Sequence, residues 1–526
     1  MDLSAALQEH FGFGGFRPGQ REAVQAALSG RDVLVVMPTG SGKSLCYQLP
    51  ALVRDDLTVV VSPLVSLMHD QVAALRARAP GRVALINAQQ DPESNRAALA
   101  RATRGELSLL YVAPERFSTP GFAERLAAAR VGLFAVDEAH CVSQWGHDFR
   151  PDYFRLAEAA RRVGAKAIVA STATATPQVA LDVVRRLGLR DPVRVTTGFD
   201  RPNLSFAVVP CRSAVDKRRR LVAALREPDA LPAIVYTGTR ASAQELAGEL
   251  RGELAEDVAV YHAGLDRGKR AAAQDAFMGG ATRVVVATNA FGMGIDKHDV
   301  RTVAHATVPP SIEAYYQEAG RAGRDGLPAR GILLAERRDK GLHVFFIERE
   351  ASKAPETLEA AASAAEAKRA RWRQFRAVWA FVEDEGCRRL AILRHFGDRS
   401  RPAPVDGVPC CDVCAPEWRP APAPAAPARA QGNGRTPISP PDGGDLDGAI
   451  LDIVVRARPA VGRTRAVEIL RGGRSRVIRD YSYDGLPGYG AYAHLTKTDV
   501  LARVDGMLSA GSLRSTGGQF PKLARA

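Results

Sequence analysis

Two segments of this chain carry residues suited to binding a nucleotide and its metal ion. Residues 38–44, Pro-Thr-Gly-Ser-Gly-Lys-Ser, follow the apolar run 33–37, and residues 137–140, Asp-Glu-Ala-His, follow the apolar run 131–136. Closely spaced glycines let backbone N–H groups wrap phosphate oxygens, and a helix that begins there directs the positive end of its dipole at them. A phosphate loop and a later acidic pair, each placed after a buried strand, predict an NTPase.

Each polar group of these segments has a role in the predicted site. We expect Lys43 to reach the β- and γ-phosphates, Ser44 and Asp137 to hold Mg²⁺, and Glu138 to position and deprotonate the attacking water. The full phosphate-loop pattern has glycine five residues before Gly42, where this chain has Met37. Taken alone, the segments also fit a Gly/Ser turn before a helix and a solvated strand end. The loop residues expected to surround the phosphates are Thr39, Gly40, Ser41 and Gly42.

Composition indicates a soluble, multidomain protein with an anionic partner. The 526 residues are 46% hydrophobic and 25% charged, with a formal net charge of +14. Such an excess favours nucleic acid as the partner, although a general use of arginine on the surface also contributes. Residues 1–4 do not resemble the start of a signal peptide, and no apolar stretch of about 18 residues is present. We therefore expect a cytoplasmic protein without a membrane span.

The cysteine distribution predicts a structural metal site. Three of the seven cysteines are scattered, and the other four occupy positions 387–414. Four thiolates suit tetrahedral Zn²⁺, and a site closed by sulfur leaves no position for a catalytic water. A redox pair is the competing interpretation, and the adjacency of two of the ligands strains a tetrahedral site. The predicted zinc ligands are Cys387, Cys410, Cys411 and Cys414.

Apolar runs divide the first 340 residues into two α/β halves. Short runs that alternate with helix-like segments are typical of buried parallel strands. In the first half they are residues 33–37, 58–61, 107–112, 131–136 and 167–170. In the second half they are residues 233–236, 258–261, 284–287, 302–308 and 331–334. We place the domains at 1–205 and 206–340, followed by a helical zinc module at 341–415.

The sequence of the remaining residues predicts a linker and a small basic domain. Residues 416–444 are rich in Pro, Ala and Gly, which predicts a linker. Residues 445–526 contain helical apolar faces and a final hairpin with a Gly-Gly turn at 517–518, the outline of a winged helix. Arginines concentrate around its second predicted helix and could grip duplex phosphates or form a solvated helix face. They include Arg463, Arg465, Arg471, Arg474 and Arg476.

The second half supplies a candidate arginine finger. Arg321 and Arg324 are one helical turn apart and follow Gln317. Phosphoryl transfer needs positive charge at the γ-phosphate, which the planar guanidinium provides. If the second sheet faces the first, Arg324 acts only when the cleft between them closes. An exposed, salt-bridged pair is the alternative.

An aromatic loop follows the acidic pair. Residues 143–151 read Ser-Gln-Trp-Gly-His-Asp-Phe-Arg-Pro. Trp145 and Phe149 offer π-faces for any base, a contact worth roughly 1–3 kcal/mol per base, and His147 and Arg150 can add phosphate or cation–π contacts. Because the loop begins three residues after the acidic segment, a stacked base could signal directly to Asp137 and Glu138. Local packing is the alternative role of these aromatic residues.

These motifs, in this order, resemble those of the RecQ-family DNA helicases of superfamily two. Residues 16–20, Phe-Arg-Pro-Gly-Gln, resemble an adenine-reading motif with Arg17, Gln20 and the neighbouring Phe13 at the base. Residues 62–71 and 113–116 resemble DNA-contact motifs, which include Ser62 and Gln71. Further matches are the DEAH box at 137–140, the coupling motif at 172–174 and the lobe junction at 199–203. The late motifs match at 291–297, with Asp296 at the nucleotide, and at 317–324.

The resemblance implies two RecA-like parallel-sheet lobes, a helical zinc module and a winged-helix (RQC) domain. It implies an ATP-dependent 3′–5′ DNA helicase that uses ATP, Mg²⁺ and Zn²⁺ in repair, recombination or replication restart. Expected partners are single-stranded and forked duplex DNA and a single-stranded-DNA-binding protein, with association to the bacterial nucleoid. Many relatives carry a further helical DNA-binding (HRDC) domain that residues up to 526 do not provide, so we expect a narrower preference for structured DNA.

Two other classes of function remain open at this stage. The chain could be a nucleic-acid-stimulated ATPase that remodels RNA or protein–DNA complexes without processive unwinding. It could also be a non-catalytic DNA-binding module, an interpretation that the intact catalytic residues disfavour.

Overall fold

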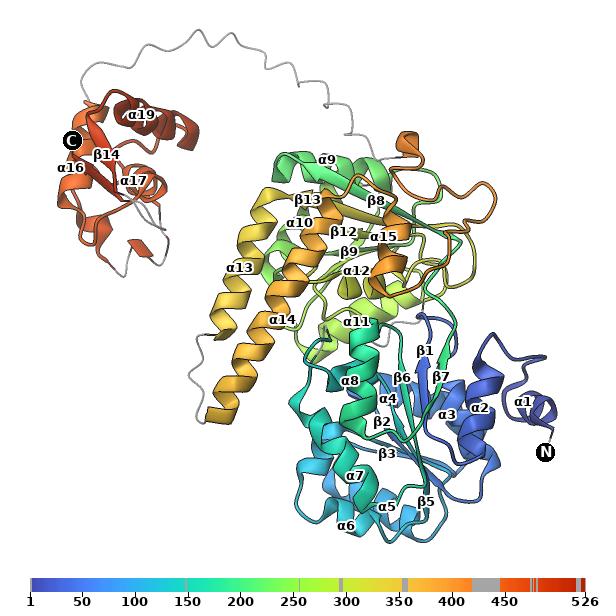
Figure 1. Ribbon diagram of the computed structural model, residues 1–526. Helices are drawn as coiled ribbons and strands as arrows, with labels where there is room; N and C mark the ends of the chain where they lie inside the picture. The colour runs from blue at the N-terminus through green and yellow to red at the C-terminus, as the bar shows by residue number, and fades with distance from the viewer. Residues whose placement is uncertain are drawn as a thin grey trace. The chain divides into compact units, whose positions relative to one another are not determined.

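The structure is a computed structural model that forms two compact units, residues 1–426 and 427–526 (Figure 1). It describes residues 2–146, 149–254, 256–292, 297–351, 358–418, 445–473, 475, 477–478, 481–516 and 522–525. The predicted linker residues 419–444 lie outside this set.

The first lobe is built on a seven-stranded parallel sheet with the order β3-β4-β2-β5-β6-β1-β7. Alternate residues of β1 enter different core clusters, Leu34 and Val36 one and Val33 and Val35 the other. Both faces of the sheet are therefore buried, which explains the continuous apolar runs in the sequence. The strands are β1 (Val33–Val36), β2 (Leu57–Val61), β3 (Val83–Ile86), β4 (Leu109–Val112), β5 (Val131–Val136), β6 (Ala167–Thr172) and β7 (Val193–Thr196).

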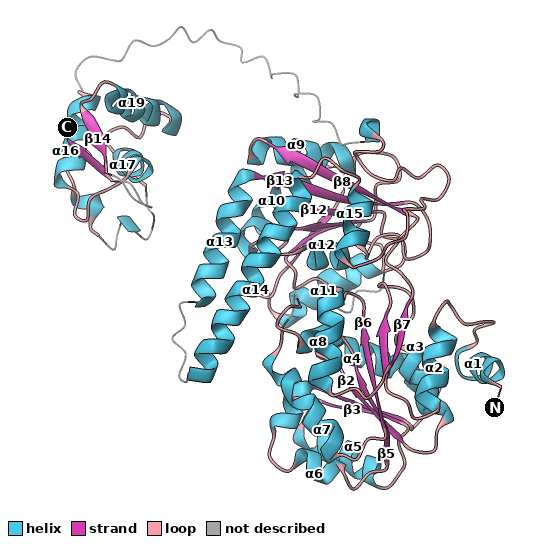
Figure 2. Cartoon of the chain, viewed as in Figure 1, coloured by secondary structure: helices cyan, strands magenta, loops and turns pink. Residues whose placement is uncertain are grey.

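Helices flank this sheet on its two sides (Figure 2). Short 3₁₀ turns follow β4 and β5 and precede α7. The α-helices are α1 (Leu3–Phe11), α2 (Gln20–Leu28), α3 (Leu45–Val53), α4 (Val65–Arg76), α5 (Pro92–Thr103), α6 (Phe122–Leu126), α7 (Leu156–Arg162) and α8 (Pro177–Leu187). The 3₁₀ turns are η1 (Pro114–Ser118), η2 (Ala139–Val142) and η3 (Pro151–Arg155).

Strand order brings the chemical motifs together. Strands β5, β6 and β1 are consecutive neighbours and run parallel, so their carboxyl ends share one edge of the sheet. The phosphate loop follows β1, the DEAH box follows β5, and the coupling motif begins at the end of β6. The Met37 amide donates to the Thr172 carbonyl over 3.2 Å, which joins two of these segments. Ligand sites at this edge are typical of open parallel sheets.

The second lobe contains a six-stranded parallel sheet with the order β10-β11-β9-β12-β13-β8. Its strands are β8 (Leu204–Cys211), β9 (Ala233–Tyr236), β10 (Val258–Tyr261), β11 (Val284–Ala287), β12 (Thr302–His305) and β13 (Ala329–Glu336). Its helices are α9 (Ala214–Leu225), α10 (Arg240–Glu253), α11 (Arg267–Met278) and α12 (Ile312–Ala319). The prediction of two consecutive parallel-sheet lobes is confirmed.

Three strands were not among the predicted apolar runs, and two of them have a clear physical reason. Strand β7 is an edge strand whose residues are mostly exposed or half-buried, so its pattern is mixed. Strand β8 is the other sheet's edge strand and contains Pro210, which an edge strand tolerates because one side needs no ladder hydrogen bonds. Strand β3 has only four residues, all buried.

The zinc module braces the junction between the lobes. Its helices are α13 (Arg337–Ala351), α14 (Leu358–Glu383) and α15 (Arg388–His395), and the 3₁₀ turn η4 (Pro416–Trp418) follows it at the start of the predicted linker. The buried Arg389 of α15 donates to Asp200 over 3.2 Å and to the Leu204 carbonyl over 2.7 Å. Phe396 stacks on Phe199, with ring centroids 4.5 Å apart. The module is thus packed onto the segment where the chain passes from one lobe to the other.

The second unit has the helices and hairpin of a winged helix. Buried Ile450, Ile453 and Val454 of α16 and Val500 and Val504 of α19 share its core. The elements are α16 (Leu446–Arg456), α17 (Arg463–Leu470), η5 (Tyr483–Gly485), α19 (Lys497–Ser509), β14 (Leu513–Ser515) and β15 (Leu523–Arg525). Strands β14 and β15 pair antiparallel, while the predicted turn at 517–518 lies outside the described residues. In the described part of the chain, no helix is both long and apolar enough to cross a bilayer.

Candidate nucleotide and nucleic-acid sites

The phosphate loop lies between β1 and α3. Gly40 and Gly42 have φ angles of 84° and 79°, a left-handed conformation that only glycine adopts without strain. The Lys43 ammonium donates to the Pro38 carbonyl over 3.3 Å, and the Ser41 hydroxyl donates to the same oxygen over 2.7 Å. Met37, at the position where the full pattern has glycine, is buried, and a Cβ added to Gly19 would lie 2.9 Å from its Cε.

Two residues of the predicted adenine-reading motif contact this loop. The buried Gln20 amide donates to the carbonyls of Ser41 and Gly42 over 3.0 and 3.1 Å. The Arg17 guanidinium donates to the Gly40 carbonyl. Both side chains therefore bind the phosphate loop, so a nucleotide base that engages Gln20 would also change how the loop is held.

An aromatic surface lies beside the loop. Phe13 is 50% exposed and stacks with Phe11 at a centroid distance of 6.1 Å. The Arg78 guanidinium lies over both rings, 5.4 Å from Phe11 and 6.0 Å from Phe13. Phe13 is thus exposed beside the loop, and its stacking on a base stays a prediction. Arg78 was not predicted, because no motif marks it and only the fold brings it here.

The metal-binding carboxylate predicted at Asp137 is buried and held by neutral donors. The Ser171 hydroxyl donates to Asp137 over 2.8 Å, and the Tyr47 hydroxyl does so over 3.4 Å. Burial raises the pKa of Asp137 and lowers the pKa of Lys43, while their opposite charges counteract both shifts. Mg²⁺ and phosphate would supply the counter-charges that both groups need. Ser44 is the N-cap residue of α3, and its hydroxyl accepts from the Gln71 amide over 3.5 Å.

The second carboxylate, Glu138, is linked to the coupling motif. It has a φ of 47°, which turns the chain sharply after β5. The Nδ1 atom of His140 lies 3.4 Å from Glu138 Oε2 and 2.9 Å from the Thr172 hydroxyl. The Thr172 hydroxyl also accepts from the Thr174 amide over 3.3 Å. His140 thus connects the predicted water-activating group to the segment after β6.

Both lobes line one cavity of about 1060 Å³ at this site. From the first lobe come the phosphate loop, the aromatic surface and the two carboxylates. The residues from the second lobe are Gln274, Met278, His298, Gln317, Arg321 and Arg324. A single cavity lined by both lobes is suited to a nucleotide whose binding and hydrolysis change the position of one lobe relative to the other.

The two candidate finger arginines are held differently. A Cβ added to Gly40 would lie 3.6 Å from Cγ of Arg324, so Arg324 lies against the phosphate loop of the other lobe. Arg321 is buried and donates to the Gly292 carbonyl within its own lobe. Asp296, predicted at the nucleotide, lies outside the described residues. Of the two arginines, Arg324 is the one that reaches the opposite lobe.

The lobe junction fixes the turn that presents Arg324. The Arg201 guanidinium donates to the carbonyls of Gly320 and Ala322 over 3.0 and 2.9 Å. The Asn203 amide donates to the Gly323 carbonyl over 2.8 Å. These positioning residues were not predicted, although their motif was recognised. The hydrogen bonds show why the junction sequence carries an arginine and an asparagine.

The residues predicted to contact DNA have several different environments. Ser62 is buried, and its hydroxyl has no hydrogen-bond partner among the described residues. Gln71 lines the nucleotide cavity and accepts from the Tyr47 hydroxyl over 3.3 Å. The Arg150 guanidinium donates to the Pro63 carbonyl over 3.0 Å. The positions of Ser62 and Gln71 do not present them on an open surface, and their DNA contacts stay predictions.

The aromatic loop is partly described. Trp145 is half-buried and lies beneath the guanidinium of Arg373, and Phe149 packs on Phe154 at a centroid distance of 5.0 Å. His147 lies outside the described residues. Both aromatic side chains therefore contact other side chains of the protein, as the local-packing interpretation predicts.

The winged-helix arginines make ion pairs within their own unit. Arg463 binds Asp505 over 2.8 Å, and Arg465 binds Glu468. Both pairs are partly exposed, and such pairs contribute little to stability. Arg474 and Arg476 lie outside the described residues. A duplex-binding role for this helix stays a prediction.

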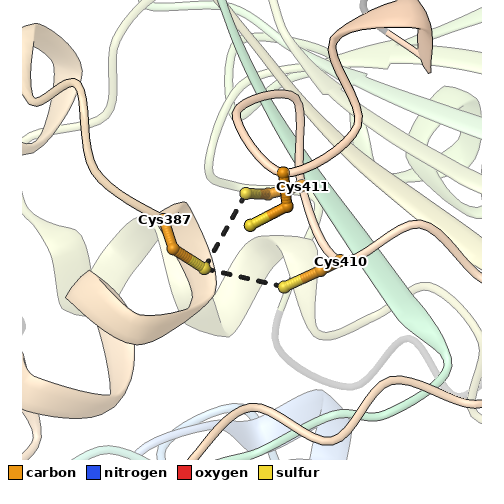
Figure 3. Close-up of side chains that lie close together, drawn as sticks. Cys387, Cys410 and Cys411 are labelled. Atoms are coloured by element: carbon orange, nitrogen blue, oxygen red, sulfur yellow. Dashed lines mark hydrogen bonds between the residues drawn. The ribbon is translucent and has the colours of Figure 1, made fainter.

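The four clustered cysteines converge on one point. Their sulfur atoms all lie within 4.8 Å of one another. Cys387 Sγ lies 3.6 Å from that of Cys410 and 3.8 Å from that of Cys411, and Figure 3 shows these side chains pointing toward one another. Tetrahedral coordination with Zn–S bonds of about 2.3 Å implies sulfur separations of about 3.8 Å. The adjacent Cys410 and Cys411 both reach the site, so the donor set fits Zn²⁺.

Family models match almost the whole chain. A DEAD/DEAH box helicase model matches residues 17–183, and a helicase conserved C-terminal domain model matches residues 216–326. A RecQ zinc-binding model matches residues 337–415, and an RQC domain model matches residues 442–525.

Named relatives extend over the same span. The ATP-dependent DNA helicase RecQ of Haemophilus influenzae is 36% identical over 492 residues, covering 92% of this chain and 72% of that protein. The protein of the same name from Bacillus subtilis is 34% identical over 519 residues, covering 98% of this chain and 81% of that protein. The chain belongs to the RecQ family of ATP-dependent DNA helicases. Its cofactors are accordingly ATP, Mg²⁺ and Zn²⁺, and the predicted fold of two lobes, zinc module and winged helix is confirmed.

A solved structure shares the RecQ chain's two-lobe fold. It is the helicase Lhr of Mycobacterium smegmatis bound to single-stranded DNA and AMP-PNP, with a TM-score of 0.51 and 24% identity. The match covers 72% of this chain and 57% of that chain. At this identity the likeness concerns the fold alone.

Proposed function

We propose that this RecQ-family chain is a motor that moves 3′ to 5′ along single-stranded DNA and unwinds the duplex ahead of it. The observation that carries the proposal is the position of Arg324 beside the phosphate loop of the opposite lobe, in the same cavity. Because the arginine and the loop belong to different sheets, hydrolysis depends on the arrangement of the lobes. Each round of nucleotide binding and release then moves one lobe relative to the other along the strand.

The residues of the cavity divide the chemistry between them. Lys43 and Arg324 stabilise the negative charge that develops on the transferring phosphate, and Gln317 and Arg321 complete the second lobe's wall. Glu138 orients and deprotonates the attacking water, and His140 holds its carboxylate in place. Ser44 and Asp137 would hold Mg²⁺, which would supply positive charge beside the phosphates.

We further propose how DNA engages each domain. The aromatic loop takes a base of the tracking strand, and the winged helix, including Arg463 and Arg465, holds the duplex at the fork. The proposed domains are 1–205, 206–340, 341–415 and 445–526, joined by the linker 416–444. Forked DNA and a single-stranded-DNA-binding protein are the proposed partners, in the bacterial cytoplasm at the nucleoid, during repair, recombination or replication restart.

The direction of movement can be tested with duplexes that carry one single-stranded overhang. We expect ATP-dependent unwinding of a duplex with a 3′ overhang and little unwinding of the same duplex with a 5′ overhang. Strand separation would be followed by native gel electrophoresis, with a blunt duplex and a reaction without ATP as controls. Equal unwinding of both overhangs would contradict the proposed direction, and ATP hydrolysis without unwinding of any substrate would favour a remodelling ATPase.

A further inference from the structure

Helix α14 of the zinc module contacts the aromatic loop of the first lobe directly. The Cζ atom of Arg373 lies 3.7 Å from the centroid of the Trp145 ring, a close cation–π contact. The next residue, Gln374, donates its side-chain amide to the carbonyls of Trp145 and Gly146 over 3.3 and 3.2 Å. Two neighbouring side chains of one helix therefore hold both the ring and the backbone of the loop.

The contact covers one face of the Trp145 ring. Trp145 is half-buried and packs against the main core cluster, and Arg373 covers one face of its ring. A base stacks at about the same separation as this guanidinium, so the two cannot occupy one ring face together. DNA that stacks on this face must first displace Arg373.

The loop is tied to the catalytic segment by close backbone packing. A Cβ added to Gly146 would lie 2.5 Å from the His140 carbonyl oxygen, so the loop and the DEAH box are in van der Waals contact at a position that only glycine allows. The Arg150 amide also donates to the Cys141 carbonyl over 3.0 Å. A shift of the loop is therefore transmitted to His140, which contacts Glu138.

Like charges on α14 weaken the contact of Arg373 with Trp145. Arg369, Arg373 and Arg376 are spaced by four and three residues, which places them on one face of the helix. Burial, followed by the positive charges of Arg369 and Arg376, lowers the pKa of Arg373, while Glu366 acts in the opposite direction. The contact with Trp145 is thus made by a cation whose neighbours repel it, as suits a contact that must be released.

We propose that Arg373 and Gln374 form a latch that holds the aromatic loop in its DNA-free position, and that an incoming base opens it by replacing Arg373 on Trp145. This inference rests on the proposed function, because it assumes that a base on Trp145 stimulates hydrolysis. According to this proposal, the zinc module determines the DNA concentration that is needed to stimulate ATP hydrolysis. Arg373 and Gln374 are positioning residues that act through the loop.

The latch predicts that its removal makes the enzyme easier to activate. We expect Arg373→Ala to lower the concentration of an oligothymidine strand that gives half-maximal ATP hydrolysis by about three- to tenfold, the factor that a lost cation–π contact represents. Gln374→Ala should lower it in the same direction but less, and Arg373→Lys, which keeps a cation over the ring, should lie near the wild type. The matched control is Lys368→Ala, which removes an equal charge from the same helix at a side chain that pairs with Glu348 of α13 over 2.8 Å.

The sign of the effect separates the latch from other roles. A loss of general positive charge, or of structural support for the loop, raises the DNA requirement, whereas loss of a latch lowers it. The inference is overturned if Arg373→Ala and Gln374→Ala both need as much DNA as the wild type or more. If the wild-type enzyme itself is not stimulated by DNA, the proposed function fails and the latch fails with it.

Discussion

Replacement of Lys43 by alanine is expected to reduce ATP hydrolysis by about 100-fold or more while single-stranded DNA binding stays close to that of the wild type. The Lys43 side chain is half-buried at the phosphate loop, where its ammonium donates to the Pro38 carbonyl. Burial lowers its pKa, so bringing a phosphate to it restores a counter-charge in a poorly solvated site. Loss of such a preorganised donor typically costs two to three orders of magnitude in turnover.

This prediction is checked by phosphate release and by fluorescence anisotropy with labelled single-stranded DNA. Lys269→Ala is a suitable control, because it removes an equal charge from a side chain that is 74% exposed and paired with Asp266. The control variant should hydrolyse ATP at the wild-type rate. DNA-stimulated turnover by Lys43→Ala at a rate similar to the wild type would show that the cavity is not the catalytic site.

Replacement of Arg324 by alanine is expected to lower the DNA-stimulated kcat by about 10³-fold with a much smaller change in the KM for ATP. An arginine finger acts on charge that develops in the transition state, so its loss affects turnover more than binding. The expected loss corresponds to about 4 kcal/mol of transition-state stabilisation. Steady-state kinetics at saturating DNA measure both constants.

The chain offers a second arginine that sharpens this test. Arg283 is half-exposed on the second lobe and pairs with Glu256, so Arg283→Ala should leave kcat unchanged. Arg324→Lys keeps the charge without the planar fork and should recover only part of the rate. A normal kcat for the Arg324→Ala variant would show that the second lobe does not contribute to the chemical step.

The sequence predicted the lobes because their central strands are buried on both faces. Five of the seven strands of the first sheet and five of the six of the second coincide with apolar runs. The edge strands β7 and β8 were not predicted, because exposed residues in β7 and Pro210 in β8 interrupt their apolar patterns. The order of strands β5, β6 and β1, which brings the motifs to one edge, could not be deduced from periodicity.

Within the candidate sites, motif residues could be named from sequence but their contacts could not. Gln71 belongs to a motif assigned to DNA, yet its place within α4 directs its amide toward Ser44 and the nucleotide cavity. Arg78 carries no motif and reaches Phe13 only through the fold. The contact of Arg373 with Trp145 joins residues 228 positions apart, a distance over which no local pattern is informative.

The central claim is that ATP is consumed between the lobes only when a DNA strand is engaged. The most direct test is the rate of ATP hydrolysis by the purified chain without nucleic acid, with single-stranded DNA and with RNA of the same length. The account predicts a low rate alone, a rate at least tenfold higher with DNA, on the order of one stacked base's contribution, and weaker stimulation by RNA. An identical rate in all three conditions would contradict it.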